Sequence, residues 1–494
     1  MQTELFKPSS KPWTPHAYQK KAVKFLLEHA ASALFLDPGL GKTSITLAAI
    51  KLLKQKKVLD KVLLIAQLRV CYSVWPKEVE KWNDFEHLKV VVLHGPNKEA
   101  LLKEDADVYV INPEGLDWLL QVKKTKVVSP KTGKVTTKVD VDLRRWKTFG
   151  FDTLVIDELS KFKHTSTNRF KSLKLVLNTF RRRWGLTGSP ASNGLMDLFG
   201  QCYILDQGRT LGHYITHYRM KYFNPSHDGF SWVLREGADE EIYERLAPLA
   251  LRMAADDYLD MPTLIENNIR VDLPGDVLQV YSQLEDDLIA KLGDGVVVAS
   301  NAAAASMKCR QVVNGGIYLD PDIEKLVKAP KSKREWLNLH TEKVDALADL
   351  IEELQGSPLL VAYDFEHDLD RLRERLGQDV PYIGGGVSAK RSAELEKAWN
   401  AGELPVLLGH PQAMAHGLNL QEVGHHVCWH SLTWDFELYD QFIRRVLRQG
   451  NKSKKVFVHH IIAKGTIDEV VLSALKSKRK GQNALFDALK KLRK

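Results

Sequence analysis

Short apolar runs recur along the chain, and each run is closed by polar or glycine-rich residues and followed by apolar positions at helical spacing. This alternation is typical of parallel strands joined by crossover helices, because strands buried on both faces are apolar almost without interruption. The pattern therefore predicts an α/β fold with two series of parallel strands. The first series comprises residues 33–36, 62–65, 108–111, 154–156 and 184–186, and the second comprises residues 359–362, 406–408, 427–429 and 456–458.

Strand signals are sparse between the two series, where segments such as residues 240–246 have helical character. A chain of 494 residues is also too long for one hydrophobic core of ordinary size. We therefore expect two tandem lobes with parallel sheets and with helical insertions between and within them. The expected domains are an N-terminal lobe at residues 1–205, a mainly helical insertion and linker at 206–342, a C-terminal lobe at 343–475 and a basic tail at 476–494.

A strongly basic segment interrupts the first lobe at about residues 121–148. Its centre, residues 130–134, is flanked by valines, and this arrangement predicts a β-hairpin. The segment is either a solvated loop that is positively charged or a surface that contacts phosphate groups, and both readings stay open. The candidate nucleic-acid contacts in it are Lys123, Lys124, Lys126, Lys131 and Lys134.

The overall charge favours a polyanionic partner. The formal net charge is +9, and clustered Lys and Arg side chains gain free energy by displacing counterions from phosphate backbones. The cysteines are far apart and form no CxxC pair, so they indicate neither a disulfide framework nor a zinc site. The chain contains no signal-peptide core and no apolar stretch of about 18 residues, so we expect a soluble, intracellular protein without a membrane span.

The first predicted strand runs into a glycine-rich loop, after which a helical stretch begins at Lys42. Glycines here let backbone N–H groups converge on phosphate oxygens, and the helix N-terminus favours negative charge. In such a loop the lysine reaches the β and γ phosphates, and the next hydroxyl ligates Mg²⁺. The strict pattern has glycine where Leu36 stands, but the order of strand, loop and helix still predicts an ATP site. Its expected ligands are Gly39, Gly41, Lys42, Thr43 and Ser44.

An acidic pair, Asp157 and Glu158, follows another apolar strand. Carboxylates at the end of a buried strand are costly unless they serve a cation, although an acidic pair is also a common helix start. Beside a phosphate loop, Asp157 is expected to hold Mg²⁺ together with Thr43, and Glu158 is expected to deprotonate the attacking water. Thr187 and Ser189 follow a third strand, and their hydroxyls are candidates for coupling the acidic pair to nucleotide state.

The second lobe carries two arginines, Arg445 and Arg448, near the end of its strand series. Their spacing predicts that both lie on one helical face and point at the same target. Arginines from a second lobe stabilise transition-state charge on a triphosphate bound to the first, so both are candidate catalytic residues. A surface helix with scattered arginines is the alternative.

Taken in this order, the motifs resemble those of superfamily 2 helicase-like motors, and specifically the Swi/Snf-type family of DNA translocases. The resemblance covers nearly the whole chain. It implies two RecA-like lobes, the cofactors ATP and Mg²⁺, and a nucleic-acid-stimulated ATPase activity. The matching segments are residues 15–19, 37–44, 64–82, 112–114, 157–160, 186–193, 359–372, 383–391, 414–420, 434–450 and 466–469.

The resemblance also implies roles for individual residues. Gln19 matches the adenine-reading glutamine of the family, and residues 75–82 match part of a motif that faces nucleic acid. Gly417 and Asn419 match the glycine-asparagine motif that links ATP state to the nucleic-acid track, and Gln441 opens the arginine motif.

The chain departs from the family pattern at two places. Leu159 and Ser160 stand where the family usually has alanine and histidine, and Asn451 replaces a glutamine. The compact ending resembles bacteriophage or bacterial members of the family. It implies the cytoplasm of a bacterium or of a phage-infected host, with the nucleus as the location if the source is a eukaryote.

Three functions are compatible with these motifs. The resemblance favours an ATP-dependent translocase on double-stranded DNA, acting in replication, recombination or repair. A strand-separating helicase on DNA or RNA is the first alternative, with the basic hairpin as its candidate pin. An inactive nucleic-acid-binding scaffold is the second, and it is disfavoured because the six key side chains are all present: Lys42, Thr43, Asp157, Glu158, Arg445 and Arg448. No motif identifies a protein partner.

Overall fold

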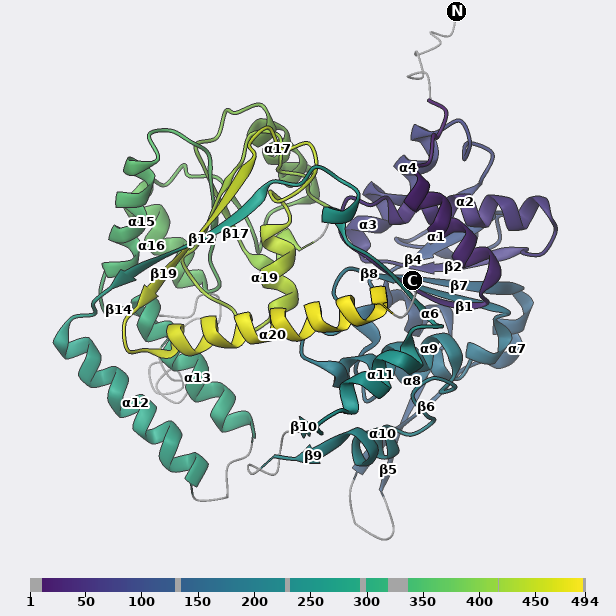
Figure 1. The fold of residues 1–494 in the computed structure, drawn as a ribbon, viewed down its shortest axis with the longest axis horizontal. Coiled ribbons are helices and arrows are strands. Elements are labelled where there is room, and N and C mark those ends of the chain that lie inside the picture. Colours follow the sequence, from purple (N-terminus) through teal and green to yellow (C-terminus); the bar gives the residue numbers. More distant parts are fainter. Residues whose placement is uncertain are drawn as a thin grey trace, which may run out of the picture. The chain divides into compact units, whose positions relative to one another are not determined.

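The computed structural model describes residues 11–128, 135–226, 232–293, 299–318, 336–415 and 417–491. The chain forms two compact units. The N-terminal unit contains Met1–Leu259 together with Lys480–Lys494, and the C-terminal unit contains Asp260–Arg479. Figure 1 shows the helices and strands of both units.

A seven-stranded sheet forms the centre of the N-terminal unit, in the order β11-β1-β8-β7-β2-β4-β3. All of its neighbouring strands are parallel. The five strands predicted from the apolar runs are confirmed as β1, β2, β4, β7 and β8. The strands are β1 (Ala31–Leu36), β2 (Lys61–Ile65), β3 (Val90–Val92), β4 (Val108–Ile111), β7 (Phe151–Asp157), β8 (Arg182–Thr187) and β11 (Ala250–Met253).

Helices cover both faces of this sheet, as Figure 1 shows. The α-helices are α1 (Ala17–Glu28), α2 (Lys42–Gln55), α3 (Leu68–Ser73), α4 (Trp75–Lys81), α5 (Lys98–Leu101), α6 (Leu116–Leu119), α7 (Leu143–Thr148), α8 (Asn168–Lys174), α9 (Leu198–Asp206), α10 (Ile215–Tyr222) and α11 (Ala238–Leu246). The shorter 3-10 helices are η1 (Pro113–Gly115), η2 (Leu159–Phe162), η3 (Leu177–Thr179), η4 (Leu195–Asp197) and η5 (Ala255–Asp257). The helix expected at residues 240–246 is confirmed as part of α11.

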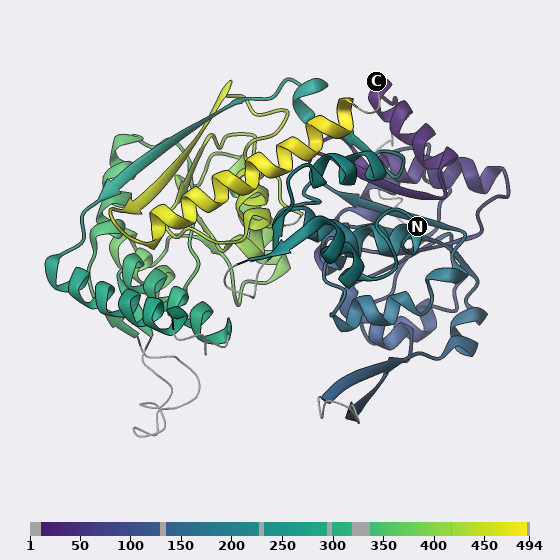
Figure 2. The ribbon, with the colours of Figure 1, turned by 60° about the horizontal axis from the view of Figure 1, so that its bottom comes forward.

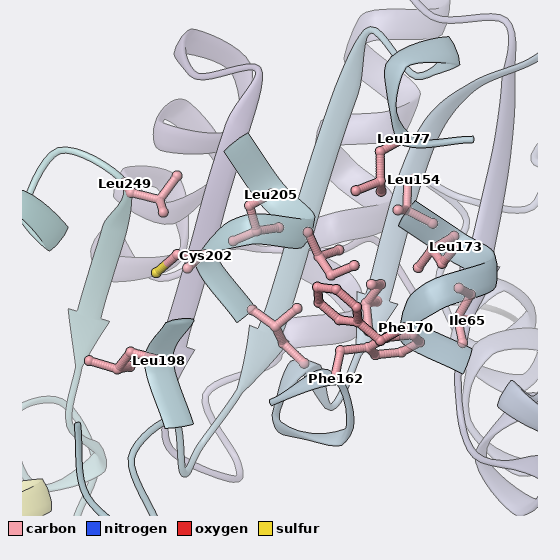
Figure 3. Packing of buried hydrophobic residues seen from close by; sticks show 14 of the residues in the cluster. Ile65, Leu154, Phe162, Phe170, Leu173, Leu177, Leu198, Cys202, Leu205 and Leu249 are labelled. Atoms are coloured by element: carbon pink, nitrogen blue, oxygen red, sulfur yellow. The ribbon is translucent and has the colours of Figure 1, made fainter. Parts of the chain in front are cut away.

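The two faces of the sheet bury separate hydrophobic cores. Alternate residues of a strand point to opposite faces, so Leu34 and Leu36 join the core beneath α1, α2 and α4, whereas Phe35 joins the core beneath α6, α8 and α9. Figure 3 shows Leu198 and Cys202 of α9 among the side chains that pack on the second face. Full burial of one such leucine contributes about 1.5–3 kcal/mol.

The C-terminal unit is built around a six-stranded parallel sheet in the order β12-β19-β18-β15-β17-β16. The four strands predicted from the second apolar series are confirmed. The strands are β12 (Thr263–Val271), β15 (Leu359–Ala362), β16 (Tyr382–Ile383), β17 (Val406–Gly409), β18 (His426–Trp429) and β19 (Lys455–Ala463). The helices are α12 (Gly275–Gly293), α13 (Ala299–Asn314), α15 (Glu342–Glu353), α16 (Glu366–Leu376), α17 (Ala389–Asn400), α18 (Pro411–Met414) and α19 (Phe436–Ile443).

Residues 206–342, expected to be mainly helical, contribute strands to both sheets. β11 pairs with β1, and β12 pairs with β19 over nine residues. The boundary of the units therefore falls after Leu259, where the expected boundary followed residue 205. β12 was not predicted because its side chains are exposed or half-buried and include Glu266 and Asn267, so the apolar pattern of a buried strand is absent. A short pair, β13 (Gly316–Tyr318) and β14 (Trp336–Asn338), also lies here.

The basic segment forms the predicted hairpin from β5 (Lys123–Val128) and β6 (Val135–Asp140). Figure 2 shows it projecting from the N-terminal unit. Every residue of β5 is exposed. The centre of the predicted hairpin, residues 130–134, lies outside the described residues. A second small ribbon is formed by β9 (Phe223–Pro225) and β10 (Trp232–Leu234).

Residues 476–491, expected as part of a basic tail, continue the helix α20 (Ile467–Lys491). Leu485 and Leu489 are fully buried and Phe486 is nearly so, and all three belong to the core of the N-terminal unit. Their spacing places them on one helical face, and this apolar stripe accounts for the burial of a segment that is otherwise rich in lysine. No helix in the described part of the chain is both long and apolar enough to span a membrane.

Candidate active site

The glycine-rich loop joins the end of β1 to the start of α2. Gly39 and Gly41 have φ angles of 93° and 79°, in the left-handed region that favours glycine. A Cβ atom on Gly41 would also lie 2.6 Å from the Nε2 atom of Gln19. Gly41 is the residue that caps α2, so the backbone N–H groups of the first helical turn begin directly after it. This geometry suits the binding of phosphate oxygens.

Gln19 lies buried in α1 against the same loop. Its Nε2 atom donates to the carbonyl oxygen of Leu40 at 3.3 Å, and its Oε1 atom accepts from the backbone N–H of His16 at 2.9 Å. The structure therefore brings this sequence-predicted residue to the phosphate loop.

The three polar residues at the start of α2 have different surroundings. Lys42 Nζ donates to the carbonyl oxygen of Leu36 at 2.8 Å. Thr43 is half-buried in the first turn of the helix. Ser44 is buried, and its hydroxyl donates to Glu78 Oε1 at 2.6 Å, so its backbone N–H is the group available to a phosphate.

Asp157 is placed beside the phosphate loop by the strand order, because β7 and β1 are separated only by β8. Its Oδ2 atom accepts from the indole Nε1 of Trp75 at 3.0 Å. Burial raises the pKa of Asp157, while the positive charge of Lys42 and the Trp75 hydrogen bond act in the opposite direction. The carboxylate and the lysine that the sequence predicted are thus close enough to interact.

Glu158 is held in an unusual conformation next to Asp157. Its φ angle is 71°, and its backbone N–H donates to the carbonyl oxygen of Leu186 at 2.9 Å. Its Oε1 atom accepts from the hydroxyl groups of Thr187 at 2.5 Å and Ser160 at 3.1 Å. A non-glycine residue at positive φ costs free energy and persists only where its surroundings hold it.

Thr187 and Ser189, the two expected coupling residues of this unit, are connected to that carboxylate. Thr187 Oγ1 accepts from the backbone N–H of Ser189 at 3.1 Å while donating to Glu158. One buried hydroxyl therefore bridges the acidic pair and the turn that follows β8. Ser160, at a position where the chain departs from the family pattern, contributes to the same cluster.

Sequence reasoning missed an ion pair beneath the phosphate loop. Asp37 Oδ1 accepts from Arg252 Nη1 at 2.8 Å, and Asp37 Oδ2 accepts from the backbone N–H of Ala255 at 3.0 Å. Both charged side chains are buried. The available signal was an arginine within the apolar run of residues 249–253, since a buried charge needs a partner.

Residues 75–82, which resemble a motif that faces nucleic acid, supply several inward contacts. Trp75 is fully buried against Asp157, and Glu78 accepts from Ser44 and from Trp82 Nε1 at 2.7 Å. These three side chains therefore support the phosphate loop and the acidic pair. An indole N–H needs a partner when it is buried, and Asp157 at the end of β7 supplies one to Trp75.

The prediction that Arg445 and Arg448 share a helical face is wrong. The helix α19 ends at Ile443, so both arginines lie in the turn after it. They still converge on one target, because each donates to the carbonyl oxygen of Leu418, at 3.0 and 3.4 Å respectively. The turn after the helix, rather than helical spacing, brings the two guanidinium groups together.

The two arginines differ in how their donors are used. Arg445 is buried, and it donates to the backbone carbonyls of Ala415 and Gln441 at 3.0 Å in addition to Leu418. Arg448 is half-buried and donates to the side-chain oxygen of Asn419. Arg445 therefore holds a backbone loop in place, and Arg448 lies at its margin.

The remaining coupling residues lie around that loop. Gly417 has a φ angle of 72°. The backbone N–H of Asn419 donates to Glu396 Oε1 at 2.8 Å. Gln441 is buried in α19, with its Nε2 atom 3.3 Å from Glu437 Oε1. The structure thus gathers Gly417, Asn419 and the two arginines in the C-terminal unit.

The hairpin lysines are only partly covered by the described residues. Lys123, Lys124 and Lys126 are exposed on β5, and Lys124 forms an ion pair with Asp117 at 2.5 Å. Lys131 and Lys134 lie outside the described residues. All four cysteines are buried free thiols: Cys71, Cys202, Cys309 and Cys428.

Both the N-terminal and the C-terminal part of the chain match models of known protein families. Residues 18–316 match the SNF2-related domain, and residues 342–450 match the helicase conserved C-terminal domain. The first of these matches alone covers more than half of the 494 residues. The two domains together make the chain a nucleic-acid-dependent ATPase.

Individual relatives agree with this assignment. The protein p41 of Acyrthosiphon pisum secondary endosymbiont phage 1 is 32% identical over 97% of this chain and 100% of its own length. The CHD3-type chromatin-remodeling factor PICKLE of Arabidopsis thaliana is 23% identical over 96% of this chain, which spans 34% of that protein.

The SWI2/SNF2 ATPase core of Sulfolobus solfataricus, solved in complex with double-stranded DNA, is 22% identical with a TM-score of 0.41, covering 97% of this chain and 94% of that one. On the match to the SNF2-related domain and the full-length relative at 32% identity, the chain belongs to the SNF2-related family of helicase-like ATPases.

Proposed function

We propose that this ATPase is a translocase that moves along double-stranded DNA while the duplex stays paired. The observation that carries the proposal is the grouping of Lys42, Asp157 and Glu158 at one edge of the first sheet, in a chain of the SNF2-related family. The side chains needed for hydrolysis are all present, so we favour an active ATPase over a binding scaffold that has lost catalysis.

ATP is proposed to bind at the loop between β1 and α2. The N–H groups at the start of α2 and the backbone of Gly39 and Gly41 would contact the phosphates. Lys42 would exchange the Leu36 carbonyl for a phosphate oxygen. Gln19, which already contacts the loop, is the proposed reader of the adenine base.

The residues at this edge fit a bound Mg²⁺. Burial raises the pKa of Asp157, so a divalent cation would stabilise its ionised form, and the hydroxyl of Thr43 lies in the adjoining first turn of α2. The cation would neutralise phosphate charge when it is bound. Glu158 is proposed to accept the proton of the attacking water, with its carboxylate held by Thr187 and Ser160.

The C-terminal unit is proposed to act in ATP hydrolysis through the loop that contains Gly417 and Asn419. Arg445 fixes that loop to the end of α19 through the carbonyls of Ala415, Leu418 and Gln441. Arg448 is the better candidate for stabilising transition-state charge. This division of roles refines the expectation that both arginines are catalytic.

Double-stranded DNA is the proposed track because the chain is basic and because members of this family move on duplexes. The net charge of +9 and the exposed lysines of β5 support a phosphate-binding surface. The relative matched over its full length is a phage protein, which favours a phage or bacterial setting. A role there in DNA replication, recombination or repair, within the bacterial cytoplasm, is part of the proposal.

A strand-separating helicase is the second candidate, and the projecting β5–β6 hairpin favours it. The two functions differ on substrates that report the fate of the duplex. On a duplex bearing a third strand, a translocase uses ATP to displace that strand, while a forked duplex of similar length stays largely paired. Efficient separation of the fork with the triplex intact would reject the translocase in favour of the helicase.

A further inference from the structure

The last turns of α20 contact the segment that holds the phosphate loop. The aromatic ring of Phe486 lies 3.6 Å from the guanidinium carbon of Arg252. Lys490 forms an ion pair with Asp257 at 2.7 Å. All four residues belong to the N-terminal unit. A residue of the last turns of α20 thus contacts the ion pair beneath the nucleotide loop directly.

Arg252 is the central member of this arrangement. Its Nη1 atom donates to the carbonyl oxygens of Phe35 and Met253, at 3.0 and 2.8 Å, and to the Asp37 carboxylate at 2.8 Å. Asp37 is the first residue of the loop, directly after β1. A rotation of this guanidinium would therefore change the support of the strand end and of the loop at once.

A buried ion pair is a weak source of net stability, because desolvation of the two charges offsets much of their attraction. Its clearer effect is to select one geometry for the groups it joins. Phe486 is nearly fully buried, and an aromatic face attracts a guanidinium most strongly when both are removed from water. The ring covers the charged group and restricts its orientation.

We propose that the C-terminal end of α20 is a positioning element of the nucleotide site, in which Phe486 orients Arg252 and Arg252 holds Asp37 at the start of the phosphate loop. Phe486 is a positioning residue, since it acts on the loop through Arg252. The inference rests on the proposed ATP site at residues 39–44.

The test compares ATP kinetics and thermal unfolding in the full-length protein with saturating duplex DNA. Phe486→Leu keeps an apolar side chain but removes the aromatic face. It should raise KM for ATP on the order of tenfold, with kcat within about twofold. Phe486→Tyr restores the face and should return KM to within about twofold of the parent value.

Leu489→Ala is the matched control, because Leu489 is buried in the same helical segment and belongs to the same core. It should lower Tm at least as much as Phe486→Leu does, and it should leave KM unchanged. An unchanged KM in Phe486→Leu, or an equal rise of KM in Leu489→Ala, overturns the proposal. Phe486→Met, judged by the same KM criterion, replaces Phe486→Leu if that variant does not fold.

Lys42→Ala separates a failure of this inference from a failure of the proposed function. It should abolish ATP turnover whatever the Phe486 variants do. Turnover at the parental rate in Lys42→Ala would place the nucleotide elsewhere and reject both proposals. Loss of turnover in Lys42→Ala together with an unchanged KM in Phe486→Leu would reject the positioning role alone.

Discussion

The hydroxyl of Thr187 donates to Glu158 Oε1 across 2.5 Å, and it accepts the backbone N–H of Ser189 at the same time. The proposed base of the reaction is therefore held by a residue from the neighbouring strand β8. The Thr187 hydroxyl therefore links the turn after β8 to the carboxylate.

Replacing this hydroxyl tests the coupling directly. Thr187→Val keeps the shape of the side chain but removes both hydrogen bonds, so the Glu158 carboxylate keeps the Ser160 hydroxyl but loses its shorter hydrogen bond and is held less firmly. DNA-stimulated ATP hydrolysis should fall roughly tenfold while ATP affinity changes by less than about twofold. Thr187→Ser is the control and should retain most of the activity. Equal activity in the valine and serine variants would remove Thr187 from the coupling pathway.

Glu158→Gln tests the assignment of the base. The amide cannot accept the proton of water, whereas Asp157 and Lys42 remain in place, so the variant should bind ATP normally and hydrolyse it about 100-fold more slowly or worse. Binding of a fluorescent ATP analogue and steady-state phosphate release measure the two effects. Hydrolysis near the parental rate in the presence of DNA would show that another group is the base.

The contacts of Arg445 and Arg448 predict different defects. Arg445→Ala removes a donor from three buried carbonyl oxygens, of which that of Leu418 keeps Arg448, so it should destabilise the C-terminal unit by about 2–5 kcal/mol. Arg448→Ala should leave Tm nearly unchanged and lower kcat, because Arg448 is half-buried at the margin of the loop. Thermal melts and DNA-stimulated ATPase assays distinguish them. The division of roles is rejected if Arg448→Ala is the more destabilised variant.

The exposed lysines of β5 predict a change in salt dependence. Replacement of Lys123, Lys124 and Lys126 by Gln should weaken duplex binding and reduce the slope of log K against log[salt] by up to about 2–3, because each lost phosphate contact contributes about 0.9. The same triple replacement at Lys20, Lys21 and Lys24, which are exposed on α1, removes equal charge from another surface. Identical slopes in both variants would assign the effect to net charge alone.

The raised pKa of Asp157 predicts that its ionised carboxylate lowers the stability of the protein, although ATP turnover is proposed to require this group. A carboxyl group whose pKa is raised by folding destabilises the protein when it is ionised, so its cost appears as pH rises above the ordinary carboxyl range near 4. Asp157→Asn should therefore raise Tm of the nucleotide-free protein at pH 8, with a smaller gain at pH 5, while abolishing ATP turnover. A lower Tm for Asp157→Asn at pH 8 would contradict this account of the site.

Much of the phosphate loop could be predicted because its parts are adjacent in the chain. Gly39, Gly41 and Lys42 act within one turn between a strand and a helix, and local spacing is enough to recognise that turn. The pair Asp37 and Arg252 could not be predicted, since the two residues are 215 positions apart and meet only because β11 lies beside β1.

The positions of Arg445 and Arg448 show where prediction from local spacing fails. Arg445 and Arg448 were expected on a helix because their separation suits one, but the helix ends two residues earlier than Arg445. Their convergence on Leu418 depends on how the turn after α19 packs against the loop at Gly417. Local spacing cannot decide where a helix ends when tertiary contacts, rather than a strong capping residue, set the boundary.

By itself the sequence determined the α/β class, nine strands of the two parallel sheets, the phosphate loop and the acidic pair, because each leaves a contiguous pattern of apolar, glycine or charged positions. Only the tertiary structure decided that β11 and β12 complete the sheets, that Thr187 holds Glu158, and that the end of α20 lies against Arg252. These features join distant parts of the chain, and their free energy comes from burial and strand pairing that no short segment encodes.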